Sequence, residues 1–185
     1  EKFAACAEQG ILAPGAHAFI NSIGNQIVSA SEWDRLGEQY RPYLHRIVME
    51  MTENEASNRE LLQEKIERMK AWGGQIAVDD FGAGYAGVVC LQELDFDVLK
   101  LDRRFLTEEE PMHSRNKVIM PDIIHSLKQF HIEPICEGVE TADQCRYLAS
   151  IGCRIVQGYY FSKPVSSEQF YAKYDELKGR YPVVD

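Results

Sequence analysis

The 185-residue sequence lacks several features that would place it in well-known classes. It has no run of about 18 apolar residues, so it predicts no membrane-spanning helix. It begins at Glu1 and has no basic and apolar segments typical of a signal peptide. Asp and Glu outnumber Lys and Arg by 29 to 20, which argues against broad binding of a DNA or RNA polymer. We expect residues 1–185 to form one cytoplasmic domain of a longer, multidomain protein. Regions outside these residues would then be the ones to tether the parent protein to a membrane.

The cysteines and histidines form no metal-binding pattern. The five cysteines contain no CxxC pair, and the five histidines contain no HExxH pair. An odd number of scattered cysteines is typical of reduced thiols that pack as small hydrophobic side chains. The sequence therefore predicts neither a disulfide framework nor a zinc site.

Short apolar runs alternate with amphipathic stretches along the whole chain. The runs lie at residues 18–20, 46–49, 75–78, 97–99, 134–136 and 154–156. They are nearly continuous and rich in β-branched residues, which favours strands buried on both faces. Strands that alternate with helices indicate a parallel sheet, so we expect an α/β fold.

Several local signals mark the intervening helices. Three pairs of residues with capping-box spacing predict helix starts, at Ser57 with Glu60, Thr141 with Gln144, and Ser166 with Gln169. Gly73 and Gly74 predict the end of the first of these helices. Pro121 interrupts another helical pattern, where we expect it to start or kink the helix.

Each expected strand is followed by a polar residue. In chain order these are Asn21, Glu50, Asp79 with Asp80, Lys100, Glu137 and Gln157. The carboxyl ends of the strands lie on one face of a parallel barrel, where barrel active sites are found. We therefore expect these side chains to converge.

The oxygen donors among these residues suit magnesium or manganese. Asp79 and Asp80 are adjacent, so together they have the carboxylates to hold two ions on a phosphodiester. A helix cap or a turn is the simpler alternative for this pair. Lys100 is a candidate to orient or activate water, or else forms an ordinary ion pair, and Asp102 is expected on the same strand face as a partner for it.

A glycine pattern offers a competing interpretation. Residues 82–87 read GxGxxG, and Asp102 follows Gly82 by 20 positions, which is the spacing of a dinucleotide-binding fingerprint. Two points argue against an oxidoreductase. Asp79 and Asp80 stand where they would repel a pyrophosphate, and residues 85–97 leave little room for a crossover helix.

Five segments resemble a known family in the right order. They are residues 47–53 (IVMEMTE), 79–85 (DDFGAGY), 100–102 (KLD), 137–141 (EGVET) and 157–160 (QGYY). The series resembles the EAL domain, the family of cyclic-di-GMP-specific phosphodiesterases, from about Phe19 to Val165.

The resemblance implies a TIM-like barrel that hydrolyses cyclic-di-GMP to linear pGpG with Mg²⁺ or Mn²⁺. By position, it implies that Asn21, Glu50, Asp79 and Asp80 bind metal. It further implies that Lys100, Glu137 and Gln157 act in catalysis, and that Glu140 and Asp102 support the loop after Asp80. It also implies a homodimer.

The sequence departs from the family at two places. No Glu-Ala-Leu segment precedes Asn21, and Glu1 and Glu8 fall in an expected helix that does not replace it. The loop carries Ala83, Ala86 and Gly87 where Thr and a Ser pair are commoner.

Truncation of a longer chain, with an upstream regulatory or sensory domain, is our first interpretation of these departures. The barrel would then lack its first strands, and a second copy or a further segment would cover the gap. The alternative is a degenerate, non-catalytic receptor for cyclic-di-GMP or a protein-interaction module.

Overall fold

A computed structural model describes residues 2–8, 15–22, 28–52, 59–83 and 95–178. In these ranges six strands form one parallel sheet in the order β1 to β6. The strands are β1 Ala18–Asn21, β2 Ile47–Thr52, β3 Gln75–Phe81, β4 Val98–Leu101, β5 Glu133–Cys136 and β6 Ile155–Val156. Each overlaps an apolar run of the sequence, which confirms the predicted α/β class and the parallel sheet.

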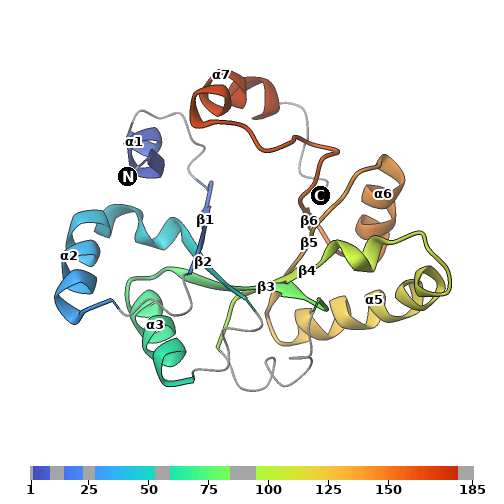
Figure 1. Ribbon diagram of the computed structural model, residues 1–185, viewed down its shortest axis with the longest axis horizontal. Helices are drawn as coiled ribbons and strands as arrows, with labels where there is room; N and C mark the ends of the chain where they lie inside the picture. The colour runs from blue at the N-terminus through green and yellow to red at the C-terminus, as the bar shows by residue number, and fades with distance from the viewer. Residues whose placement is uncertain (1, 9–14, 23–27, 53–58, 84–94, 179–185) are drawn as a thin grey trace.

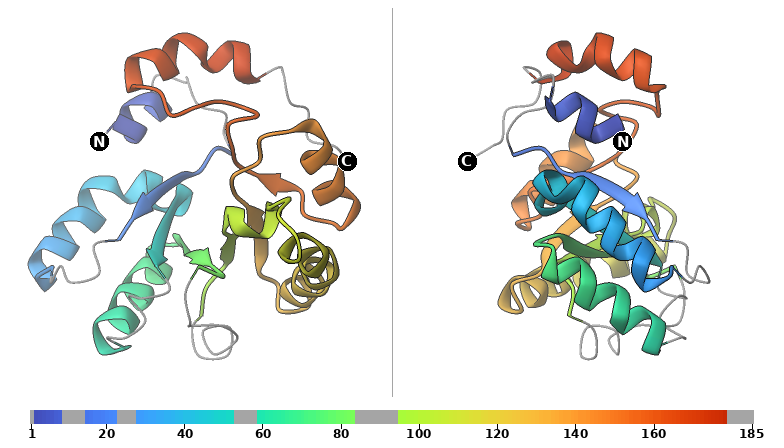
Figure 2. Two further views of the ribbon diagram at one scale, coloured as in Figure 1. Left: turned by 45° about the vertical axis from the view of Figure 1, so that its right-hand side comes forward. Right: turned by 90° about the vertical axis from the view of Figure 1, so that its left-hand side faces the viewer.

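Helices cover the outer face of the curled sheet (Figure 1). They are α2 Ala30–Tyr40, α3 Arg59–Ala71, α5 Met112–Gln129 and α6 Ala142–Ser150, with short 3₁₀ helices η1 Arg41–Arg46 and η3 Arg103–Leu106. Two further helices, α1 Lys2–Glu8 and α7 Ser167–Lys178, lie on the open side of the curve, as both views in Figure 2 show. The molecule is therefore a half-barrel with its helices outside.

The two faces of the sheet pack differently. Between the sheet and the helices lies a large core, which includes Met49, Ile76, Leu99, Ile66 and Met120. The inner face has a separate small cluster of four buried residues, Val48, Ala77, Val98 and Ile135. Since side chains alternate along a strand, the residues two positions further along these strands also point inward.

The structure confirms some of the predicted helix signals and contradicts one. Thr141 and Gln144 form a reciprocal capping box at α6, and Ser166 and Gln169 exchange the same two bonds before α7, as predicted. Ser57 and the side chain of Glu60 lie outside the described part of the chain. Pro121 was expected to start or kink a helix, but α5 begins at Met112, so the start is wrong. The proline removes one backbone hydrogen bond from the helix, and the neighbouring turns and tertiary packing stabilise the helix by more than this loss costs.

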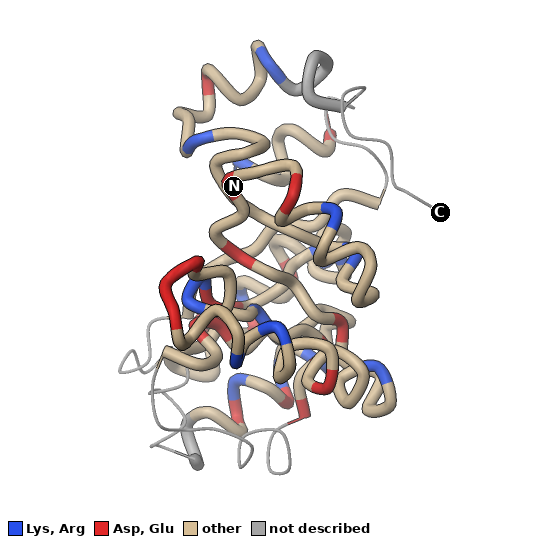
Figure 3. Tube along the Cα trace, turned by 90° about the vertical axis from the view of Figure 1, so that its right-hand side faces the viewer, with Lys and Arg blue, Asp and Glu red and all other residues tan. Residues whose placement is uncertain are grey.

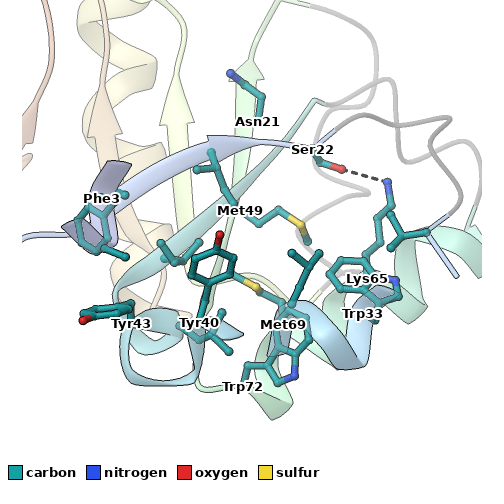
Figure 4. Close-up of a pocket in the computed structure, with 17 residues that line it drawn as sticks. Phe3, Asn21, Ser22, Trp33, Tyr40, Tyr43, Met49, Lys65, Met69 and Trp72 are labelled. Carbon is teal, nitrogen blue, oxygen red and sulfur yellow. Dashed lines mark hydrogen bonds between the residues drawn. The ribbon is translucent and has the colours of Figure 1, made fainter. Parts of the chain in front are cut away.

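A cavity of about 380 Å³ is lined by residues of α1, α2, α3 and η1 and of strands β1 and β2. Aromatic and methionine side chains line much of it, and the rings of Trp33 and Trp72 stand 5.3 Å apart. Figure 4 shows Asn21 at its edge, with the side chain directed away from Met49 and Tyr40. The cavity is thus separate from the inner face, where the polar strand residues gather.

The cysteines behave as small core residues where they are described. Cys6, Cys136 and Cys153 are buried and Cys145 is partly buried, all as free thiols, while Cys90 lies outside the described residues. Within the described ranges, no helix is both long and apolar enough to cross a membrane.

Candidate active site

Lys100 lies at the centre of a cluster of carboxylates on the inner face. Its Nζ is 2.5 Å from Oε1 of Glu50, 2.7 Å from Oε1 of Glu137 and 3.1 Å from Oδ1 of Asp79. Lys100 and Glu50 are only 4% and 8% exposed. One ammonium balances only part of the charge of three carboxylates, so the cluster keeps a net negative charge that a bound cation would offset.

The alternation of the strands explains why these four residues meet. Glu50, Asp79, Lys100 and Glu137 each follow, by two positions, one member of the inner cluster. Side chains two positions apart point to the same side of a strand. The inner apolar cluster therefore lies beneath the charged residues, which are displaced from it toward the carboxyl ends of β2 to β5.

Asp80 would point away from the site in a regular strand, but a β-bulge changes this. Val78 pairs with Leu99 and Phe81 with Leu101, so β3 takes three steps where β4 takes two. Asp80 has a φ of 58°, in the left-handed region that Asp tolerates better than most residues. The bulge brings two consecutive carboxylates to one side.

Three acids are close enough to share a cation. Carboxylate oxygens of Asp79, Asp80 and Glu137 all lie within 4.8 Å of one another. Hard oxygen donors in this number suit Mg²⁺ or Mn²⁺ better than softer metals. The donor set thus fits a divalent cation, with Glu50 as a further buried oxygen ligand nearby.

The charges at the site shift one another's protonation. Burial lowers the pKa of Lys100, but its hydrogen bonds to Glu137 and Glu50 and the charge of Asp79 outweigh burial, and the pKa lies well above its usual value. Burial raises the pKa of Glu137, which contact with Lys100 offsets only in part. Burial and the neighbouring charge of Asp79 also raise the pKa of Asp80. Lys100 is therefore an ammonium at neutral pH.

The other expected site residues lie around this cluster. Asn21 is exposed at the end of β1, in register with Glu50. The side chain of Gln157 is exposed after β6. Its backbone N–H donates a hydrogen bond to the carbonyl of Cys136, and its carbonyl accepts one from the N–H of Val139. Glu140 is exposed, and the loop beyond Ala83 that it is expected to support lies outside the described residues, as do Ala86 and Gly87.

Asp102 does not contact Lys100 as expected. Its carboxylate accepts a 2.9 Å hydrogen bond from the backbone N–H of Arg104 and lies 3.4 Å from the Nε of that residue. Two positions after Lys100 the chain has left β4 and turned into η3, so the side chain no longer follows the alternation of the strand. Sequence reasoning also missed Arg104, because an exposed arginine beside an acid carries no distinctive signal.

Lys and Arg are interspersed with Asp and Glu over the side shown in Figure 3. On this side the described residues gather into no single basic face. An anionic ligand at the inner site would therefore depend on local groups there, Lys100 and any bound cation, rather than on a broad positive surface.

Comparison with known proteins identifies the family. The model of the EAL domain matches residues 2–164. The chain belongs to the EAL domain family. Its parallel half-barrel is accordingly part of an EAL-type, TIM-like barrel.

Relatives of this EAL chain include enzymes and solved structures. It is 33% identical over 161 residues to PdeG of Escherichia coli K12, named a probable cyclic di-GMP phosphodiesterase, which covers 84% of this chain and 31% of PdeG. The EAL domain of Mycobacterium smegmatis DcpA superposes with a TM-score of 0.83 at 26% identity, covering 98% and 81% of the two chains. The PaMucR phosphodiesterase, in complex with c-di-GMP, gives 0.76 at 25% identity, covering 91% and 69%. The matches span 13% to 31% of the length of curated relatives.

Proposed function

We propose that this EAL domain serves as a metal-dependent phosphodiesterase that hydrolyses cyclic-di-GMP to linear pGpG. The observation that carries the proposal is the cluster of Glu50, Asp79, Asp80 and Glu137 around Lys100. Membership of the family and the names of PdeG and PaMucR supply the substrate class.

Asp79, Asp80 and Glu137 would hold the cation, with Glu50 and Asn21 as further oxygen ligands. When bound, Mg²⁺ or Mn²⁺ would neutralise the phosphodiester and make water a better nucleophile. The cation also accounts for how an acidic site accepts an anionic substrate.

Lys100 would orient the attacking water and stabilise the charge that develops on the phosphate. Against the effect of burial, the carboxylates around Lys100 raise its pKa and favour the charged ammonium, which suits orienting water and stabilising charge. Glu137 lies 2.7 Å from Lys100 and keeps the ammonium in place. In the reaction the water oxygen bonds to phosphorus, one P–O3′ bond breaks, and the 3′ oxygen takes up a proton. Gln157 would contact the water from the end of β6.

The direct test is chromatography of cyclic-di-GMP incubated with the full-length parent protein and Mn²⁺. We expect pGpG to form, and Asp80→Asn to lower the rate by at least about 100-fold, because it removes a charged ligand. Asp122→Asn, an exposed acid on α5, is the matched control and should leave the rate unchanged. A full-length parent that leaves the substrate intact, while a control enzyme cleaves it, would refute the proposal.

A non-catalytic receptor is the second candidate. The ammonium of Lys100 already pairs with three carboxylates, which is an arrangement that can persist without turnover. Binding of cyclic-di-GMP by the parent protein, with no pGpG formed, would favour this candidate.

The parent protein is proposed to work as a cytoplasmic homodimer with a regulatory or sensory domain upstream. The far greater length of its curated relatives supports a multidomain parent. Glu140 is proposed to support the loop after Ala83, so that dimer contacts influence the site.

A further inference from the structure

The turn that carries Asp80 is intrinsically unfavourable. Asp80 has a left-handed backbone with a φ of 58°, a conformation that is sterically unfavourable for residues other than glycine, although Asp tolerates it better than most. It also places two carboxylates side by side, and like charges at this distance repel. Such an arrangement persists only where the surrounding structure holds it in place.

A backbone hydrogen bond closes the turn, and η3 packs against it. The N–H of Ala83 donates to the carbonyl of Asp80 at 3.0 Å. The ring of Phe105 packs so closely on Gly82 that a side-chain carbon at position 82 would collide with it. The turn therefore rests on η3, and whatever fixes η3 also fixes the turn.

Arg104 provides the polar link between the two segments. Its Nη1 donates a 2.9 Å hydrogen bond to the carbonyl of Ala83, and its Nε lies 3.4 Å from Asp102. The planar guanidinium can bond both partners at once, which the single ammonium of a lysine does less well. One side chain thus joins the end of the turn to the cap of η3.

Arg104 is in turn held by α5. The buried Asn116 donates from Nδ2 to the carbonyl of Arg104 at 2.8 Å. The backbone N–H of Asp102 donates to the carbonyl of Phe81 at 3.2 Å, which anchors the other end of the segment to β3. These bonds connect a helix on the outside of the half-barrel to the bulge on the inside.

We propose that Arg104 is a positioning residue that holds the turn at Ala83 and so keeps the Asp80 carboxylate in the cation site. The proposal rests on the proposed function in so far as Asp80 is a metal ligand there. Within the described residues, Arg104 contacts neither Asp79 nor Glu137. It acts on Asp80 through the backbone of the turn, and its positive charge also favours the ionised Asp80 carboxylate through space.

The test compares Arg104→Gln and Arg104→Lys with the unaltered protein and with Arg115→Gln, an exposed arginine on α5. Titration calorimetry with Mn²⁺ measures affinity, and thermal unfolding checks that each variant is folded. We expect Arg104→Gln to weaken Mn²⁺ binding by about tenfold, as loss of a residue that orients a ligand does. Arg104→Lys should fall between it and the unaltered protein, and Arg115→Gln should bind normally.

A second readout needs no metal. Hydrogen exchange at the amide of Ala83 reports on the turn directly, and we expect it to be faster in Arg104→Gln than in Arg115→Gln. Unchanged exchange in a folded Arg104→Gln protein would overturn the proposal. So would equal Mn²⁺ affinities in a protein that binds the ion. An unaltered protein that binds no Mn²⁺ at all would count against the proposed function, while the exchange result would still decide whether Arg104 holds the turn.

Discussion

Among single residues, Lys100 has the largest influence on the charge of the site, because it supplies the positive charge among the carboxylates. Three carboxylates contact its ammonium, and one of them, Glu50, is 8% exposed. Buried acids of this kind require a positive partner, which is either the lysine or a bound divalent cation. The lysine and the cation should therefore partly replace each other in stabilising the protein.

Substituting Lys100→Met tests this relation. In the absence of metal we expect a loss of about 3 to 5 kcal/mol in the free energy of unfolding, because buried acids lose their cation. Addition of Mn²⁺ should raise the melting temperature of Lys100→Met by more than it raises that of the unaltered protein. Thermal unfolding with and without Mn²⁺ measures both effects. The control is Lys117→Met on the exposed side of α5, and equal melting temperatures for the two variants without metal would contradict the expectation.

The charged residues of the site were identifiable from sequence, but their exact contacts were not. Polar residues that follow buried runs marked Glu50, Asp79 and Glu137, because strand ends converge in a parallel sheet. The contact of Asp102 with Arg104 was missed, since it depends on where β4 ends and η3 begins. Such a boundary is set by tertiary packing and carries little local signal.

At the scale of elements, two loops that carry proposed catalytic residues are joined through their backbones. The N–H of Val139 donates to the carbonyl of Gln157 at 3.0 Å, and the N–H of Tyr160 donates to the carbonyl of Val139 at 3.0 Å. Gly158 lies between these bonds, and any side-chain carbon there would overlap backbone atoms of Val139. Only glycine permits this approach, so the loop after β5 and the loop after β6 are positioned together.

Gly158→Ala is therefore expected to be severe. A backbone neighbour cannot move aside as a flexible side chain can, so we expect a loss of about 3 kcal/mol or more in the free energy of unfolding. Urea unfolding followed by circular dichroism gives the value. Gly15→Ala is the matched control, because a carbon added there meets no atom within 4 Å. If the two variants unfold at the same urea concentration, the close approach at Gly158 does not constrain the fold.

The strands and several helix ends followed from the sequence because their signals are local. Thr141 with Gln144 satisfies two backbone groups of α6 within four residues, so the capping box is visible without tertiary structure. The bulge at Asp79 and Asp80 was not predicted. It depends on pairing between β3 and β4, and the pattern of either strand alone does not reveal the extra residue.

At the scale of the whole molecule, the half-barrel has two sheet edges, β1 and β6, within the described residues. The terminal helices contact each other across the open side, where the Nζ of Lys2 donates to Ser167 and the thiol of Cys6 donates to Tyr171. These contacts leave Phe19 and Ile20 of β1 exposed by 41% and 48%. An edge strand with exposed apolar side chains is prone to pair with another chain.

Self-association of this chain through β1 is the expected consequence. It is distinct from the homodimer proposed for the parent protein, in which a further segment of the barrel would cover this edge. Phe19→Lys should weaken the self-association by about tenfold, since a charge at an edge disfavours pairing and the burial of one phenylalanine is lost. Sedimentation velocity over a range of micromolar concentrations measures the dissociation constant. Val118→Lys, at a 69% exposed position of α5, is the control. A greater effect of Val118→Lys would place the interface on α5, and a protein that stays monomeric at every concentration would show that the terminal helices alone suffice to protect the open side.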